Sequence, residues 1–521
     1  MENNTTFPTS LEEGGSKKSS DDPIDTLGGR MHLRWDRQVE MSTNAHHVLF
    51  SEFLRVSGLF DHLVETAPLV YTSNNAPEKR NVIGTAALCI LDGAKRFRHF
   101  DSLFGDTVSA ELFGMTKTQS CDSVRRGLLG MNSEAALKWV WNENLHCLAP
   151  LLAQQYALDL DPTVKTLYGH QEGAAVGYNP HKHGRPSHCF HVMSIAELRM
   201  PVGFVILPGN ETSGADSMPM LELFLGGVPA ELQPYLIRGD VGFGTEKIIV
   251  ICEKYKRHYL FKVRRSDGVK ALWKKALGDE SGWVNAGEGW QAYECKTKLK
   301  SWTKARRTIL VRRPVKEDTV DSESADAKPK AVQQELPLAE IVGTAKTKLE
   351  DGYEWYMLVT DLDDGVAMIS KTYRQRGNCE NIYDEMKNQW GWGGFNSHKL
   401  SCTAIAAGMT AIVANWWNVF CRLGEDGVHR EAITSRPLLQ RCVASIMVRS
   451  RQKIVTLYMK GKEKTCEIFS KIHTYLSGVS SATQLKPEER WMQVLNHAFR
   501  QYDLKKRLFP PIVDGQYTLN L

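Results

Sequence analysis

The 521-residue sequence lacks several features that mark particular classes of protein. Its 11 cysteines are widely spaced and include no C-x-x-C pair, which argues against a disulfide scaffold and favours a reducing compartment. The first thirty residues are polar and contain no apolar segment, so we predict no secretory signal and a disordered tail at 1–30. We therefore expect a cytoplasmic protein.

A strong overall charge is missing too, because the net charge is only +5. The hydrophobic and charged fractions, 42% and 24%, are those of a soluble globular protein and exclude a fibrous or membrane-dominated one. One segment, 400–421, has no Asp, Glu, Lys or Arg and is long enough to cross a bilayer. Because it contains Asn415, Asn418 and two threonines, we predict a buried helix of a soluble domain and no membrane partner.

The spacing of apolar residues divides the chain into regions of different structure. Helical spacing predicts a helical N-terminal region at 31–150, where a polar turn leads into a helix that carries Arg125 and Arg126. A helix-turn-helix DNA reader would fit this segment, and an ordinary capped surface helix fits it equally well. From about 151, short β-rich runs alternate with helices and predict a mixed α/β fold. Asp161 and Asp240 end two of its strands, where ligand sites of open sheets gather.

Residues 251–313 carry the strongest charge bias, with 17 Lys or Arg against 6 Asp or Glu. Tryptophans and tyrosines are interleaved with these basic residues. Basic side chains neutralise phosphates and aromatic faces stack on bases, so we predict nucleic-acid contact here. The alternative is a solvated basic β surface whose aromatic side chains pack inward.

Four side chains of the segment 373–387 fall on one face of a predicted helix. At about 100° per residue, Arg376, Glu380 and Lys387 lie at about −60°, −20° and −40° from Tyr373. A carboxylate flanked by cations suits a metal ion beside a phosphate. A solvated helix with i,i+4 charge pairs gives a similar pattern.

The spacing Y-x2-R-x3-E-x6-K of these four residues resembles the signature of the DDE transposases of bacterial insertion sequences. It is carried by the cut-and-paste group whose catalytic domain has a β-rich insertion. Two upstream segments are similar to the Asp segments of that family: Asp161 followed by Thr163, and the R-x-D-x-G-F block at 238–243. Val241 stands where a small polar residue is common. The resemblance covers about 85–425.

The resemblance implies an RNase H-like catalytic core that is interrupted by a β-rich insertion and flanked by helical N-terminal and C-terminal regions. The expected order is a disordered tail at 1–30, a helical DNA-binding region at 31–150, the first part of the core at 151–265, the insertion at 266–355 with an acidic flexible loop at 314–340, the second part of the core with the catalytic helix at 356–425, and a helical C-terminal region at 426–521.

The resemblance also implies the chemistry. Asp161, Asp240 and Glu380 would be the catalytic residues and would bind two Mg²⁺ ions, for which Mn²⁺ can substitute. Asp159 rivals Asp161 because residues i and i+2 share a strand face, and Asp384 is a weaker rival of Glu380.

By the same resemblance, Tyr373, Arg376 and Lys387 would contact phosphates at the transposon end. One tryptophan of the basic stretch would stack on a flipped base, and the candidates are Trp283, Trp290 and Trp302.

The expected function is that of a DNA transposase. Such an enzyme cleaves at terminal inverted repeats of double-stranded DNA and joins the 3′-hydroxyl ends to target DNA. A homodimer holding two ends, in the nucleoid of a bacterial cytoplasm, is implied. Two alternatives stay open: a catalytically silent DNA-binding protein descended from such an element, and another RNase H-like nuclease.

Overall fold

The computed structural model describes residues 22–33, 39–153, 155–179, 182–314, 352–440, 442–481 and 485–500. Nearly all of the predicted acidic loop at 314–340 and most of the predicted tail at 1–30 lie outside these ranges. Where the tail is described, the prediction is wrong, because β1 (Asp22–Thr26) and β2 (Gly29–Leu33) form an antiparallel hairpin. Gly29 turns the chain there with a φ of 101°, which favours glycine.

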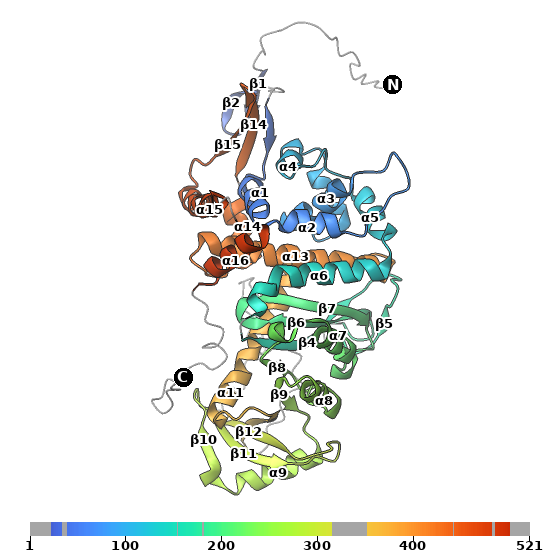
Figure 1. Cartoon of the computed structure of the whole chain (residues 1–521), viewed down its shortest axis with the longest axis vertical. Coiled ribbons are helices and arrows are strands. Elements are labelled where there is room, and N and C mark those ends of the chain that lie inside the picture. The colour runs from blue at the N-terminus through green and yellow to red at the C-terminus, as the bar shows by residue number, and fades with distance from the viewer. Residues whose placement is uncertain are drawn as a thin grey trace.

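A large mixed sheet forms the centre of the molecule (Figure 1). Its first half runs in the order β7 (Met200–Pro208), β6 (Pro186–Ile195), β4 (Ala157–Thr166), β8 (Leu236–Gly239) and β9 (His258–Val263). β4 is antiparallel to β6 and parallel to β8, which is parallel to β9. The short β5 (Ala175–Val176) pairs with β6, and α7 (Met218–Gly227) and α8 (Glu246–Lys254) connect the later strands. The predicted mixed α/β fold is confirmed.

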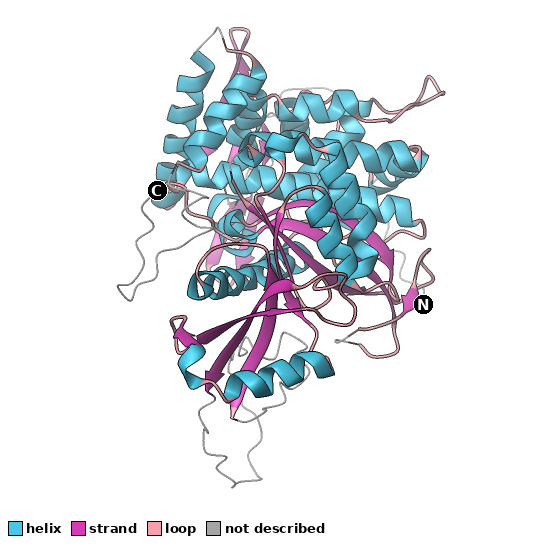
Figure 2. Ribbon diagram, turned by 60° about the horizontal axis from the view of Figure 1, so that its bottom comes forward, coloured by secondary structure: helices cyan, strands magenta, loops and turns pink. Residues whose placement is uncertain are grey.

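The predicted insertion continues the same sheet. β13 (Tyr353–Thr360) pairs with β9, and β12 (Arg306–Pro314), β11 (Gln291–Thr297) and β10 (Trp283–Asn285) follow outward. α9 (Asp267–Leu277) covers this extension (Figure 2). The expected boundary at 355 therefore falls inside a strand.

Helices from the N-terminal and C-terminal regions of the chain form a layer beside the sheet. The N-terminal region contains β3 (Glu40–Ser42), α1 (His46–Ser57), α2 (Leu59–Thr66), α3 (Lys79–Leu91), the 3-10 turn η1 (Phe97–Leu103), α4 (Thr107–Leu112), α5 (Cys121–Gly130) and α6 (Ser133–Leu152). Asp106, Ser120 and Asn132 begin α4, α5 and α6, and each side chain accepts a hydrogen bond from a first-turn N–H.

α13 (Leu400–Gly424) and α6 lie between the other helices of this layer and the sheet, and both pack on β7 (Figure 1). By length and composition it could cross a membrane, but its most apolar window is completely buried inside the protein. A β-carbon on Gly408 would lie 2.7 Å from Val140, so glycine is what permits the close approach of α6 and α13. The predicted buried helix is confirmed.

The C-terminal region is not purely helical, which corrects the prediction for 426–521. After α14 (Ala432–Gln440), β14 (Val443–Arg449) and β15 (Gln452–Tyr458) form a hairpin, and β14 also pairs with β3. α15 (Glu463–Ser481) and α16 (Pro487–Ala498) then pack on α1 and α13. The partner strand β3 lies about four hundred residues away, so local periodicity did not reveal this sheet.

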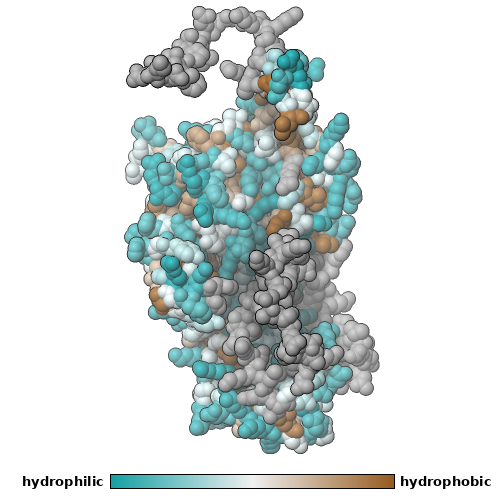
Figure 3. Space-filling model, turned by 180° about the vertical axis from the view of Figure 1, so that it is seen from behind, coloured by the Kyte–Doolittle hydropathy of each residue, from teal (hydrophilic) through white to brown (hydrophobic). Residues whose placement is uncertain are grey.

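The surface seen from behind is mostly hydrophilic (Figure 3). On the described part of that face, hydrophobic side chains stand singly or in small groups. Scattered apolar side chains are normal for a protein surface and mark no particular partner.

Candidate active site

Asp161 and Asp240 lie side by side because their strands are parallel neighbours. The last paired residues of β4 and β8 are Leu160 and Gly239, and each aspartate follows directly. Asp240 is held by its turn, where its Oδ1 accepts a hydrogen bond from the N–H of Gly242 at 2.9 Å. The parallel register therefore brings two predicted catalytic residues to the edge of the sheet at the carboxyl end of β8. The strand β4 itself continues past Asp161 to Thr166, paired with β6, so the prediction that Asp161 ends its strand is wrong.

Glu380 approaches the same edge on α12 (Asn378–Asp384), a helix that packs against β4. Burial raises the pKa of Asp161 to about 7; the Arg376 cation opposes this rise, while the charges of Asp240 and Glu380 add to it. Burial also raises the pKa of Glu380. The three predicted carboxylates therefore share one electrostatic environment.

Arg376 is the cation of this environment. Its Nη1 lies 3.8 Å from Oδ1 of Asp161, and its side chain is 16% exposed. Its Nε and Nη1 atoms are buried and have no hydrogen-bond partner among the described residues. A buried guanidinium with unused donors suits an anionic ligand beside the carboxylates.

The surroundings of Asp159 indicate a structural role, which distinguishes it from Asp161. Its side chain is fully buried and forms two hydrogen bonds of 2.7 Å with Arg238. Arg238 also binds Glu197 at 2.8 Å and donates to the carbonyl of Thr372. Asp159 is therefore neutralised inside the core, which favours Asp161 as the metal-binding residue of this strand.

Asp384 is exposed, and its Oδ1 accepts a hydrogen bond of 2.6 Å from Asn388. Glu380 is half-buried beside Arg376, whose charge acts on its carboxyl group. These environments favour Glu380 over Asp384.

The segment 373–387 is not the single α-helix that we predicted. α11 (Val366–Arg374) ends in a 3-10 turn, η6 (Gln375–Gly377), and α12 then widens into a π-helical turn, η7 (Glu385–Gln389). The 3-10 and π-helical turns do not have 3.6 residues per turn, so the angles that we predicted for an α-helix do not apply. Arg376 and Lys387 still lie near Asp161, whose charge opposes the lowering of the Lys387 pKa by burial.

Tyr373 is mostly buried in this structure, and its expected contact with a phosphate stays a prediction. Only 8% of its surface is exposed, and its ring lies 5.6 Å from the ring of Tyr356. Burial raises its pKa to about 12.

The tryptophans of the basic stretch are mostly in the core. Trp290 and Trp302 are 7% and 3% exposed, so neither offers a free face to a flipped base in this conformation. Trp283 is half-buried, with Arg312 4.0 Å from its ring centre. The sequence left open the alternative that these aromatic side chains pack inward. The burial of Trp290 and Trp302 favours that alternative for these two side chains.

Arg125 and Arg126 lie on α5, which is capped by Ser120 and packs on α3 and α13. Arg125 forms an ion pair of 3.1 Å with Asp122, and Arg126 is exposed. α5 therefore has the features of a capped surface helix, and the guanidinium groups of Arg125 and Arg126 both lie at the surface.

Lys165 is a buried titratable residue of β4 that sequence reasoning missed. It lies on the same face of β4 as Asp161, is 5% exposed, and donates to the carbonyl of Phe395 at 3.3 Å. Burial lowers its pKa to about 7. The alternation Asp159, Asp161, Thr163, Lys165 was the available signal.

Lys165→Met is expected to raise the free energy of unfolding at pH 7 by about 3 kcal/mol. The folded-state pKa of Lys165 lies below that of the unfolded chain, so the unfolded chain binds more protons between about pH 7 and 10.5. Wild-type stability should therefore gain a contribution as pH rises through this window, and the variant should lack it. Urea midpoints at pH 7 and 9.5 measure the difference. The exposed Lys247→Met variant should keep the wild-type pH dependence, and equal slopes for Lys165→Met would contradict the prediction.

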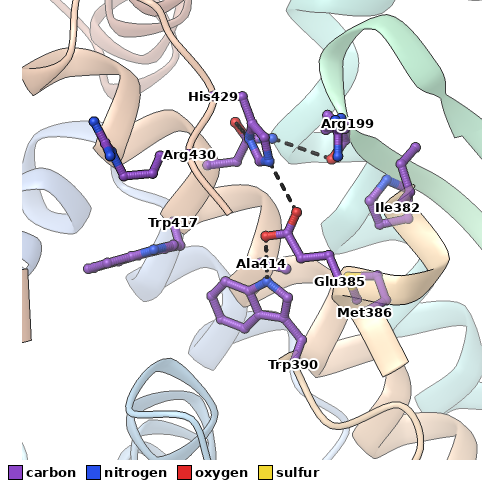
Figure 4. A pocket seen from close by; sticks show the side chains of 11 residues that line it. Arg199, Ile382, Glu385, Met386, Trp390, Ala414, Trp417, His429 and Arg430 are labelled. Atoms are coloured by element: carbon purple, nitrogen blue, oxygen red, sulfur yellow. Dashed lines mark hydrogen bonds and ion pairs between the residues drawn. The ribbon is translucent and has the colours of Figure 1, made fainter. Parts of the chain in front are cut away.

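Figure 4 shows how the π-helical turn is fixed from the C-terminal side. Glu385 accepts hydrogen bonds from His429 (3.0 Å), Trp390 (3.2 Å) and the N–H of Ala432 (3.1 Å). The cavity beside them has a volume of about 10 Å³, too small for a substrate. This cluster is therefore a clamp that holds η7, which carries Lys387.

Glu385→Gln is expected to lower the free energy of unfolding by about 1–3 kcal/mol, because the amide cannot accept from all three donors. Urea unfolding measures this loss. The exposed neighbour gives a matched control: Asp384→Asn should change stability by less than about 0.5 kcal/mol. Equal stabilities of the two variants would show that the clamp contributes nothing.

Comparisons with known proteins point to the part of the chain that contains this site. A family model described as transposase DDE domain group 1 matches residues 129–413, more than half of the chain, and this span includes Asp161, Asp240 and Glu380. Among solved structures, the chain is similar to one titled as the cryo-EM structure of a piggyBac transposase synaptic complex with hairpin DNA. The TM-score is 0.39 and the identity 12%, over 92% of this chain and 89% of that chain. No curated protein sequence matches.

Proposed function

The chain belongs to the family of DDE transposase domains, group 1, and from this membership we propose a cut-and-paste DNA transposase of a bacterial insertion sequence. The observation that carries the proposal is the edge of the sheet where Asp161, Asp240 and Glu380 share one electrostatic environment with Arg376. Arg376 and Glu380 also stand in the spacing of the family signature stated above.

We propose that the core is RNase H-like. The strand order β7-β6-β4-β8-β9 supports it, with two antiparallel pairs followed by two parallel pairs. The added strands β10 to β13 would be the family's β-rich insertion.

The donor set fits magnesium, because Asp161, Asp240 and Glu380 offer only oxygen ligands. Their oxygens do not converge on a single point: among the described residues, the one trio of metal-capable side chains within 4.8 Å lies elsewhere. Carboxylates that hold two ions a few ångströms apart need no such convergence. Two Mg²⁺ ions there, with Mn²⁺ as a substitute, would activate the attacking hydroxyl and stabilise the leaving oxyanion.

The chain itself would orient the DNA. The unused donors of Arg376 would bind a phosphate next to the carboxylates, and Lys387 would supply a second cation. Arg125, Arg126 and the basic surface at 251–313 would add contacts to the duplex. The partners would be the terminal inverted repeats and target DNA, held by a homodimer in the bacterial nucleoid.

The test uses purified full-length protein and duplexes that carry the inverted repeats flanking its coding region. With Mg²⁺ or Mn²⁺ we expect nicks at the repeat ends and joining of the 3′-hydroxyl to a plasmid. Protein that binds the ends yet never nicks them with either metal would overturn the proposal in favour of a silent DNA-binding protein. Preferential cutting of an RNA–DNA hybrid would indicate a different RNase H-like nuclease.

A further inference from the structure

Two buried histidines and an aspartate meet in the helical layer. His46 and His47 open α1, and Asp92 follows the last turn of α3. Both histidine side chains are fully buried, and that of Asp92 is 15% exposed. Their ligand atoms all lie within 4.8 Å of one another, which is true of no other such trio in the described part of the chain.

The spacing of these atoms is that of donors around one ion. Nε2 of His46 lies 3.0 Å, and Nε2 of His47 2.9 Å, from the same Oδ1 of Asp92. Donors bound to one zinc ion at about 2.0–2.1 Å in a tetrahedral site are about 3.3 Å apart, only slightly farther than these atoms. The other oxygen of Asp92, Oδ2, is buried and has no hydrogen-bond partner in the structure.

The hydrogen bonds of His47 leave one position, between its ring and Asp92, for a proton or a cation. Its Nδ1 lies 2.7 Å from Oγ of Ser109, and that hydroxyl donates to Asp106 at 2.9 Å. A hydroxyl has one proton, so Nδ1 must be the donor to Ser109. In a neutral ring, Nε2 then points a lone pair at the carboxylate of Asp92, and either a second ring proton or a cation must lie between them.

A further observation favours the cation. The path from His47 through Ser109 to Asp106 has the form of the outer contacts that orient zinc-bound histidines.

Arg436 is a cation near this cluster. Its guanidinium donates to the carbonyls of Leu91, Ile90 and Gln389. These bonds use its donors on neutral carbonyl groups, so the described partners of the Asp92 carboxylate are the two histidines.

We propose that His46, His47 and Asp92 bind one zinc ion, which joins the start of α1 to the end of α3 beside α4. Two nitrogen donors and a carboxylate are a ligand set that zinc prefers and magnesium does not. The ion would stabilise the helical layer, and it is independent of the proposed reaction at Asp161.

The experiment uses untagged full-length protein in the Asp161→Asn background, which weakens metal binding at the sheet edge. We expect about one zinc per chain by plasma mass spectrometry after gel filtration. Removal with a chelator should lower the unfolding temperature, and re-addition should restore it. Titration of the stripped protein with Co²⁺ should give visible absorption bands that saturate at one equivalent and disappear when Zn²⁺ is added.

The double variant His46→Gln/His47→Gln should lose the zinc and the cobalt bands. His146→Gln is the matched control, because His146 stacks on His62 in the same helical layer but belongs to no such trio. Absence of zinc and of cobalt bands in the parent chain overturns the proposal, as does zinc that survives the double substitution. If the double variant does not fold, X-ray absorption of the parent chain decides, because two imidazole ligands are required.

Discussion

Asp161→Asn is expected to lower the rate of DNA cleavage by about 10³-fold or more while the protein stays folded. Loss of one carboxylate removes several kcal/mol of the charge stabilisation that bound ions give the transition state. The unfolding midpoint should be unchanged or higher, because a neutral amide removes the repulsion from Asp240 and Glu380. Rates of nicking at the inverted repeats, with urea unfolding of the same samples, measure both quantities.

The matched control is Asp384→Asn, which removes an exposed carboxylate from the same helix as Glu380. It should cleave within about twofold of the wild type, since surface substitutions away from special features change little. An active Asp161→Asn enzyme would show that this aspartate is not a catalytic residue, and the assignment of the site to this edge of the sheet would fall with it.

Arg238→Met is expected to be the most destabilising single change, at about 3–5 kcal/mol. The guanidinium is completely buried and neutralises both Asp159 and Glu197, at 2.7 and 2.8 Å. Methionine would leave two carboxyl groups in the core without their cation. Urea unfolding gives the loss directly.

A second variant separates charge from packing. Adding Asp159→Asn to Arg238→Met should recover part of the lost stability, because only Glu197 then stays uncompensated. If Arg238→Met lost less than about 1 kcal/mol, or if the second substitution made the protein still less stable, the buried ion-pair cluster would not be what holds β4 and β8 together.

Sequence reasoning was strongest where a pattern is local. The alternation and apolar runs of the strands predicted the mixed α/β fold, and the length and composition of 400–421 predicted the buried helix α13. It was weakest where partners are remote. The strand β14 pairs with β3, about four hundred residues away. The hairpin of β1 and β2 is local, but the polar composition of the first thirty residues did not indicate it.

For the candidate site, too, the sequence supplied local information and the structure supplied the contacts between distant segments. Residue type and spacing singled out Asp161, Asp240 and Glu380, whose shared environment the structure then supplied. Spacing alone did not separate Asp161 from Asp159, because both lie on one face of the strand. The ion pair of Asp159 with Arg238, which is 79 residues away, makes that distinction.

The sequence by itself determined the strands, the buried helix and the residue types able to bind metal, because periodicity and side-chain chemistry are properties of neighbouring residues. Only the tertiary structure decided that Trp290 and Trp302 are buried, that His429 clamps the π-helical turn, and that His46 and His47 meet Asp92. The physical reason is that burial and hydrogen bonding depend on contacts between distant segments, which form when the layers pack.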